Sequence, residues 1–264
     1  MDYKMLLEKR VQLIGELSYD KNLVFICPSR KSYEAIINKT SILFEDSLKD
    51  VQLIELILYR QVRHIVQNSL QSAADKLQLV SRLFENEQQY FDINFNLLCN
   101  ATKTKTIEFS HLTDRSEIIA ELSNFSGLNT MGSRSTRALQ TAEELIMNAQ
   151  INASSNLHQA SKLNSQIKIE ISDHLIAFSA FDPFGTLDIK KFFKRIEAGQ
   201  ALGLDKSMNF KKGGAGVGSS LIFENCDSLF LGVQPTKKTR VSVIMPYNIT
   251  ERKFEGIQKS IHLF

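Results

Sequence analysis

The sequence predicts an α/β protein in two parts, and three observations lead to this prediction. Alternating polarity marks strands, apolar residues at helical spacing mark helices, and glycine is unevenly distributed along the 264 residues. Nine of the twelve glycines lie between Gly185 and Gly256, whereas the first 126 residues contain only Gly15. We therefore expect a mixed α/β domain over residues 1–125, regulatory or partner-binding, and a second domain over residues 126–264.

In the first part we expect short strands and a long helical stretch. Residues 51–83 carry apolar side chains at helical spacing, which predicts one long helix or two shorter ones. Asp114, with Glu117 three residues later, predicts the start of a helix that continues through Leu122. Short apolar or alternating runs predict strands at residues 23–27, 42–44, 91–95 and 104–109.

The second part is predicted to run in the order helix, two strands, helix, glycine-rich loop, helix and two strands. Asp188 is a candidate N-cap for the second helix, and Gly199 is expected to end it. The helices are expected at residues 135–153, 190–198 and 219–225, and the strands at residues 166–172, 175–181, 228–233 and 239–245.

Composition limits the classes of function. Hydrophobic residues make up 43% of the chain and charged residues 23%, as in globular proteins, which excludes a disordered or coiled-coil chain. No run reaches the roughly 20 apolar residues of a membrane-spanning helix. The N-terminus lacks the unbroken apolar segment of a signal peptide, so we expect a cytoplasmic protein without a membrane partner. A net charge of +3 does not predict nucleic-acid binding.

Glu144 and Asn148 are the first candidate site residues. They lie four residues apart on a predicted helix, so they share one face, whereas the apolar residues lie on another. A carboxylate there can accept a proton, and a carboxamide oxygen can ligate magnesium. Taken alone, the same spacing also occurs on a solvated helix face.

Asp182 and Gly185 form the second candidate. Asp182 ends an apolar strand, and Pro183 and Phe184 break the chain direction after it, which leaves a carboxylate at the strand end. Aspartate before proline is also ordinary turn chemistry.

A glycine-rich segment before the next helix is the third candidate. Its glycines leave backbone N–H groups open to phosphate, and the helix start adds favourable partial charge. It is neither a dinucleotide fingerprint, because no strand precedes it, nor a Walker A motif, because no Gly-Lys-Ser/Thr follows. A flexible loop is the alternative. The segment contains Lys211, Lys212, Gly213, Gly214, Ala215, Gly216, Val217 and Gly218.

In this order, the three motifs resemble the N, G1 and G2 boxes of the GHKL ATPases, the superfamily with the Bergerat fold. The strand that begins at Thr239 is similar to the closing strand of that family. The resemblance covers residues 134–246 and is greatest to anti-sigma-factor serine kinases and histidine-kinase catalytic domains. It implies a two-layer α/β sandwich at the C-terminus, after a mixed α/β N-terminal domain. A fragment beginning near Asn129 is therefore expected to keep the nucleotide site if it folds.

The resemblance also implies roles for these residues. Glu144 would orient or deprotonate the attacking group, and Asn148 would ligate Mg²⁺. Asp182 would accept a hydrogen bond from the adenine amino group, Thr239 would support Asp182 or its water, and Gly185 would let the base approach. Residues 186–212 would form the lid over the nucleotide. The phosphates of ATP would be bound by Lys211, Lys212, Gly213, Gly214, Gly216 and Gly218.

Departures from the family pattern leave the function open. Pro183 and Phe184 stand at the usual central glycine of the G1 box, which suggests looser binding of adenine or stacking on Phe184. We expect an ATP- or ADP-binding signalling regulator that phosphorylates a protein partner or sequesters it according to nucleotide state. The alternative is a non-catalytic nucleotide-binding module, so activity as a kinase or ATPase is left open. A histidine kinase is less favoured, because His64 lacks phosphoacceptor neighbours, and a homodimer is left open.

Overall fold

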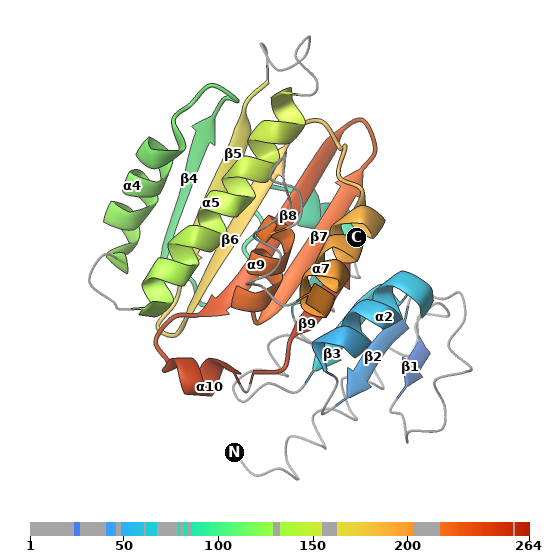
Figure 1. Cartoon of the computed structure of the whole chain (residues 1–264). Coiled ribbons are helices and arrows are strands. Elements are labelled where there is room, and N and C mark those ends of the chain that lie inside the picture. Colours follow the sequence, from blue (N-terminus) through green and yellow to red (C-terminus); the bar gives the residue numbers. More distant parts are fainter. Residues whose placement is uncertain are drawn as a thin grey trace.

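The computed structural model of the chain describes residues 24–26, 41–45, 49–60, 62–67, 79, 82–83, 86–128, 133–154, 163–202, 217–255 and 257–264. These residues form a nine-stranded mixed sheet with helices on one face (Figure 1). The strand order is β1-β2-β3-β9-β7-β8-β6-β5-β4. The α/β class predicted from the sequence is therefore confirmed.

The sheet has an antiparallel part and a smaller, partly parallel part. Antiparallel pairing joins, in this order, β4 (Lys103–Phe109), β5 (Ser165–Ile171), β6 (Leu175–Asp182), β8 (Lys238–Pro246) and β7 (Ser228–Gln234). β9 (Ser260–Leu263) then pairs parallel with β7 and antiparallel with β3 (His64–Gln67). The parallel strands β2 (Ser41–Glu45) and β1 (Val24–Ile26) complete the sheet beside β3.

One helix layer covers the sheet (Figure 1). Its central helix, α5 (Ser133–Ser154), presents small and branched apolar residues to the strands: Ala138, Ala142, Leu145, Ile146 and Ala149. The other helices of the layer are α2 (Asp50–Arg60), α4 (Arg115–Ser126), α7 (Ile189–Leu202) and α9 (Val217–Asn225). A short helix, α10 (Glu251–Glu255), precedes β9.

The opposite face of the sheet is also covered. The 3-10 helix η2 (Glu87–Phe91) and the residues after it pack there, in a second hydrophobic cluster that includes Tyr90, Leu98 and Phe230. Strand alternation separates the two cores, because Phe178 of β6 faces the helices while Ala177 faces this second cluster. We call residues 86–98 the back cover.

The structure corrects the predictions for two segments of the first part. In the stretch predicted to be helical over residues 51–83, helix α2 and residues 79, 82 and 83 are helical, but residues 64–67 form strand β3. Ile65 and Val66 are fully buried in the sheet, between β2 and β9. A strand buried on both faces is a continuous apolar run, which periodicity alone does not distinguish from a helix. Residues 91–95, predicted as a strand, belong to the 3-10 helix and the loop after it.

Asp114 and Gly127 limit helix α4, whereas Gly199 does not limit α7. The Asp114 carboxylate accepts a hydrogen bond from the Ser116 N–H at 2.9 Å, as the sequence predicts for an N-cap. Gly199 lies inside α7, which continues to Leu202. A Cβ atom at Gly199 would collide with the Ser220 hydroxyl of α9. This glycine permits close packing of two helices and does not end one.

The sheet crosses the predicted domain boundary at residue 126. All seven residues of β4 pair with β5, and helix α4, before the boundary, packs beside α5. Where the chain divides into domains therefore stays a prediction. In the part of the chain that the structure describes, no helix is both long and apolar enough to cross a membrane.

Candidate functional site

Helix α5 holds Glu144 against the start of helix α9. Gly218, the second residue of α9, lies so close to the Glu144 carboxylate that a Cβ atom there would collide with it. The Oε2 atom of Glu144 is buried and has no hydrogen-bond partner among the described residues. Burial raises the pKa of Glu144, the charge of Glu143 raises it further, and Arg115 offsets part of this. Glu144 is thus a partly desolvated carboxylate, and its Oε2 atom is unpaired within the described part of the chain.

Asn148 lies one turn further along α5 and is half-buried. Its four-residue spacing from Glu144 places both side chains on the same side of the helix, as predicted. The core residues Leu145, Ile146 and Ala149 lie on the side that faces the sheet. The carboxylate and the carboxamide therefore project together beside the core.

Asp182 and Thr239 lie opposite each other at the ends of β6 and β8. Both are buried, at 4% and 2% exposure. Asp182 Oδ1 accepts hydrogen bonds from the N–H groups of Phe184 (3.0 Å) and Gly185 (3.3 Å), which forms an Asx turn. The buried hydroxyl of Thr239 has no partner among the described residues.

Gly185 is required by its own backbone and by its neighbour. Its φ is +62°, which favours glycine. A Cβ atom here would collide with the carbonyl of Gln234 and lie 2.9 Å from the N–H groups of Thr236 and Lys237. The turn between β7 and β8 therefore packs directly on the loop that follows Asp182.

Strand alternation brings these motifs to the helix-covered face. Val243 and Met245 of β8 belong to the helix-side core, and so, by period two, Thr239 faces that side. The same count from Phe178 and Ala180 places Asp182 there. Five other predicted site residues lie outside the described residues: Lys211, Lys212, Gly213, Gly214 and Gly216.

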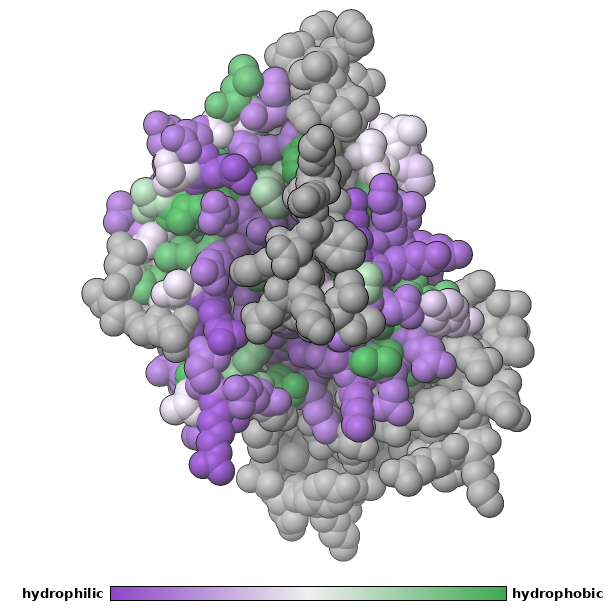
Figure 2. Space-filling model, in the orientation of Figure 1, coloured by the Kyte–Doolittle hydropathy of each residue, from purple (hydrophilic) through white to green (hydrophobic). Residues whose placement is uncertain are grey.

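Two open grooves lie on the other side of α5, between it and α4. Their volumes are about 460 and 540 Å³, and both are lined by Asp114 and Arg115. Neither is lined by Glu144, Asn148, Asp182 or Thr239. Figure 2 shows hydrophilic and hydrophobic residues mixed over this face rather than gathered in one large apolar surface. The motif residues therefore lie apart from both grooves.

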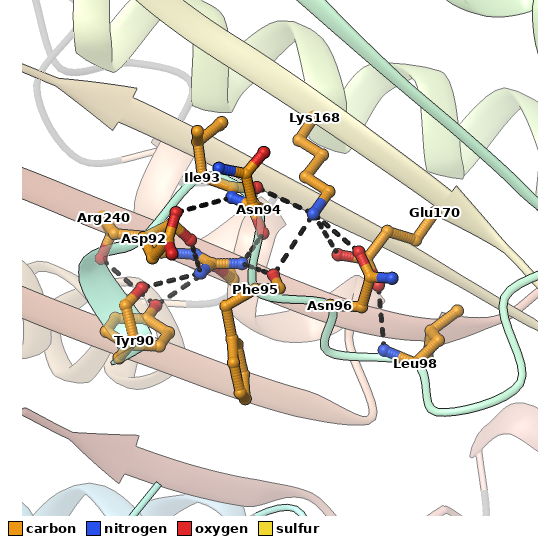
Figure 3. Close-up of polar contacts among 12 residues, drawn as sticks. Tyr90, Asp92, Ile93, Asn94, Phe95, Asn96, Leu98, Lys168, Glu170 and Arg240 are labelled. Atoms are coloured by element: carbon orange, nitrogen blue, oxygen red, sulfur yellow. Dashed lines mark hydrogen bonds and ion pairs between the residues drawn. The ribbon is translucent and has the colours of Figure 1, made fainter. Parts of the chain in front are cut away.

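A buried charged cluster on the opposite face was not predicted (Figure 3). Arg240 is fully buried, and Lys168 and Glu170 are 2% and 1% exposed. Burial lowers the pKa of Lys168, and the charge of Glu170 raises it back in part. Lys168 Nζ lies 3.6 Å from Glu170 Oε1 and donates to Ile93 O at 2.8 Å, Phe95 O at 3.2 Å and Asn96 Oδ1 at 2.7 Å.

These residues look solvent-facing in the sequence. Lys168 and Glu170 occupy the polar positions of an alternating strand, which normally point to water. The one available signal is Arg240, a charge in the interior of β8 that is followed by the apolar residues Val241 and Val243. A search of protein-family models and of curated proteins with this sequence finds no match.

Proposed function

We propose that the chain binds ATP where helix α5, the end of β6 and the start of α9 meet, in a domain of the Bergerat fold. One observation carries the proposal. Motifs far apart in the sequence project to one side of one sheet, with Glu144 against Gly218 and Asp182 opposite Thr239. Two of these residues have buried oxygen atoms without a described partner, Glu144 and Thr239. Buried polar groups normally have partners, so a polar ligand is a reasonable occupant.

In this proposal Asp182 recognises the base. Its Oδ1 atom already accepts two backbone N–H groups, and its second oxygen would accept the adenine amino group. The buried hydroxyl of Thr239, which has no partner in the described part of the chain, would hold a bridging water or the base itself. Both residues are buried, which would make their hydrogen bonds stronger than at an exposed site.

Glu144 would serve as the general base. It would take the proton of the attacking water or hydroxyl group as that oxygen bonds to the γ-phosphorus and ADP leaves. Its raised pKa makes the carboxylate a better proton acceptor near neutral pH than an exposed glutamate. Asn148 would hold Mg²⁺, which when bound would neutralise charge on the phosphates. The product would be a phosphorylated protein partner or free phosphate.

The alternative is a nucleotide-binding module without turnover, which would hold or release its protein partner according to nucleotide state. The Asx turn favours it, because capping Phe184 and Gly185 accounts for Asp182 without catalysis. Turnover of ATP, measured with binding, separates the two candidates.

Replacing Asp182 by Asn tests the nucleotide site with little change in shape. Asn keeps Oδ1 as acceptor for the turn, but its amino group faces the donor of adenine. We expect D182N to lose about 1–3 kcal/mol of ATP affinity, or about 5- to 150-fold. Calorimetric titration with ATP, with and without Mg²⁺, measures this. ATP affinity equal to wild type in folded D182N would refute the site.

A further inference from the structure

The back cover contacts the sheet directly behind the proposed adenine site. Arg240 follows Thr239 in β8, and Phe181 precedes Asp182 in β6, so each site residue has a neighbour on the opposite face. The Arg240 guanidinium lies 4.6 Å from the centre of the Phe181 ring. Strands β6 and β8 therefore hold the proposed site on one face of the sheet and contact the back cover on the other.

Arg240 joins this strand pair to the back cover (Figure 3). Its Nε donates to the Ser242 hydroxyl and its Nη2 to the Ser179 hydroxyl, both at 3.0 Å. The remaining donors reach carbonyls of the back cover: Tyr90 O at 2.6 Å, Asp92 O at 3.2 Å and Phe95 O at 3.4 Å. Burying a guanidinium costs desolvation free energy. That cost is offset chiefly when every N–H donor forms a hydrogen bond.

Tyr90 of the back cover in turn contacts strands β7 and β8. Its hydroxyl donates to the carbonyl of Phe230 at 2.9 Å and lies 3.1 Å from the Ser242 hydroxyl. A Cβ atom at Gly232 would lie 2.6 Å from the Tyr90 ring, so any larger residue in this strand would push the ring out of its place. The ring also lies 4.8 Å from the Arg240 guanidinium.

The back cover also holds the turn between β7 and β8 at both ends. Gln234 Nε2 donates to Gln88 Oε1 at 2.5 Å, and Lys238 Nζ donates to Phe91 O at 3.3 Å. The turn between them packs against Gly185 without space for a side chain. Contacts thus run from the back cover through the turn to the loop of Asp182.

We infer that the back cover fixes the shape of the adenine end of the site, with Tyr90 and Arg240 as positioning residues. This rests on the proposed function, and it adds a route by which the first part of the chain regulates nucleotide binding. A buried ion cluster is poor evidence of added stability and better evidence of a fixed arrangement. Displacing residues 86–98 would free the turn, loosen Gly185 and weaken ATP binding.

Coupling between two sites is reciprocal, so ATP must stabilise the back cover if the back cover supports ATP binding. Hydrogen exchange of the full chain with and without ATP and Mg²⁺ tests this. The reporters are the amides of Gln89, Asp92 and Phe95, which donate hydrogen bonds within the back cover, and the amide of Leu98, which donates to the Glu170 carboxylate of β5. We expect their exchange to slow about fivefold or more with ATP, beyond any change in β4 at the sheet edge.

Two variants test the same coupling by mutation. Q88A removes the hydrogen bond between Gln88 and Gln234 at the turn. Q166A is the matched control, because it removes an exposed side-chain hydrogen bond between Gln166 and Glu108 at the far edge of the sheet. We expect Q88A to lose about two- to tenfold in ATP affinity and Q166A to lose none. Y90F, which keeps the ring but not the hydroxyl bonds, should lose at least as much, with folding checked by thermal unfolding.

The outcomes separate the two proposals. If wild type binds ATP, but exchange of the back cover does not change and folded Q88A and Y90F bind like wild type, the coupling is overturned and the nucleotide site stands. If wild type does not bind ATP, both proposals are overturned.

Discussion

At the scale of single residues, burial determines the chemistry of Glu144, because its Oε2 atom has no hydrogen-bond partner among the residues that the structure describes. An exposed glutamate on a helix would be solvated, but this carboxylate lies beneath the start of α9, where Gly218 leaves just enough space for it. Its raised pKa follows mainly from burial. A carboxylate in this state is costly to keep unless it serves a ligand or a reaction.

E144Q separates binding from chemistry. Glutamine has the same shape but cannot accept the proton, so ATP affinity should stay within a few-fold of wild type. If the chain turns over ATP, turnover should fall by about 10²–10⁴-fold. Calorimetry measures the affinity, and phosphate release or phosphotransfer to a protein measures the rate. Turnover equal to wild type in E144Q would exclude Glu144 as the base.

At the scale of elements, Gly199 illustrates how a local rule fails. Glycine after a helical run predicts a helix end, yet here α7 continues past it because α9 packs closely against that position. No property of residues 190–202 reveals that a serine of another helix lies there. Asp114, in contrast, caps α4 through a hydrogen bond to a residue two positions later, which the sequence does reveal.

A double-mutant cycle tests the packing at Gly199. In an uncrowded helix, Gly to Ala stabilises by about 1 kcal/mol. In α7 the added methyl group collides with the Ser220 hydroxyl, so G199A alone should gain nothing or destabilise. G199A in an S220A background should recover much of the 1 kcal/mol, measured by urea unfolding. Equal effects of G199A in both backgrounds would show that the two helices do not meet at these residues.

At the scale of the whole molecule, what can be predicted depends on how local the cause is. The hairpin of β5 and β6 was predictable because its alternation and the turn at Ser172 and Asp173 lie within one short stretch. The shared face of Glu144 and Asn148 follows from helical spacing alone. The pairing of Asp182 with Thr239 depends on strand register, which no local pattern specifies.

The charged positions of the strands show the same limit. Lys168 and Arg240 alternate with apolar residues, and both lie on the face of the sheet opposite the helices. What covers that face is a segment more than 70 residues earlier in the chain. Its carbonyl groups accept hydrogen bonds from these cations, and a segment with a single short 3-10 helix leaves little pattern to recognise.

The seam between β3 and β9 predicts a pH dependence of stability. His64 lies opposite His262, with ring centres 5.7 Å apart, beside Phe264 and next to Arg63. Burial lowers the pKa of His64 well below 6.5, and the charges of His262 and Arg63 lower it further. The unfolded chain therefore binds a proton below about pH 6.5 that the folded chain does not.

Stability from His64 should thus be complete above about pH 6.5 and fall as the pH drops, by up to about 1.4 kcal/mol per pH unit. Urea unfolding between pH 5 and 8 measures this. H64L should lose this part of the slope, while the contribution of carboxylates at lower pH remains. A slope in H64L equal to that of wild type would assign the effect to other groups.

The sheet and the back cover together also change the expectation for a fragment that begins near Asn129. Such a fragment contains the proposed contacts to ATP, but it lacks β4, α4 and residues 86–98. Removing β4 exposes the edge of β5, and removing the back cover exposes Phe230 and leaves Arg240 without its carbonyl partners.

We expect residues 129–264 to lack cooperative thermal unfolding and to bind no ATP. A control fragment from residue 79 keeps these contacts and should unfold with a measurable transition. Circular dichroism and calorimetry compare the two. Cooperative unfolding and ATP affinity equal to the full chain in residues 129–264 would show that the second part is self-sufficient and that the back cover is only an attachment.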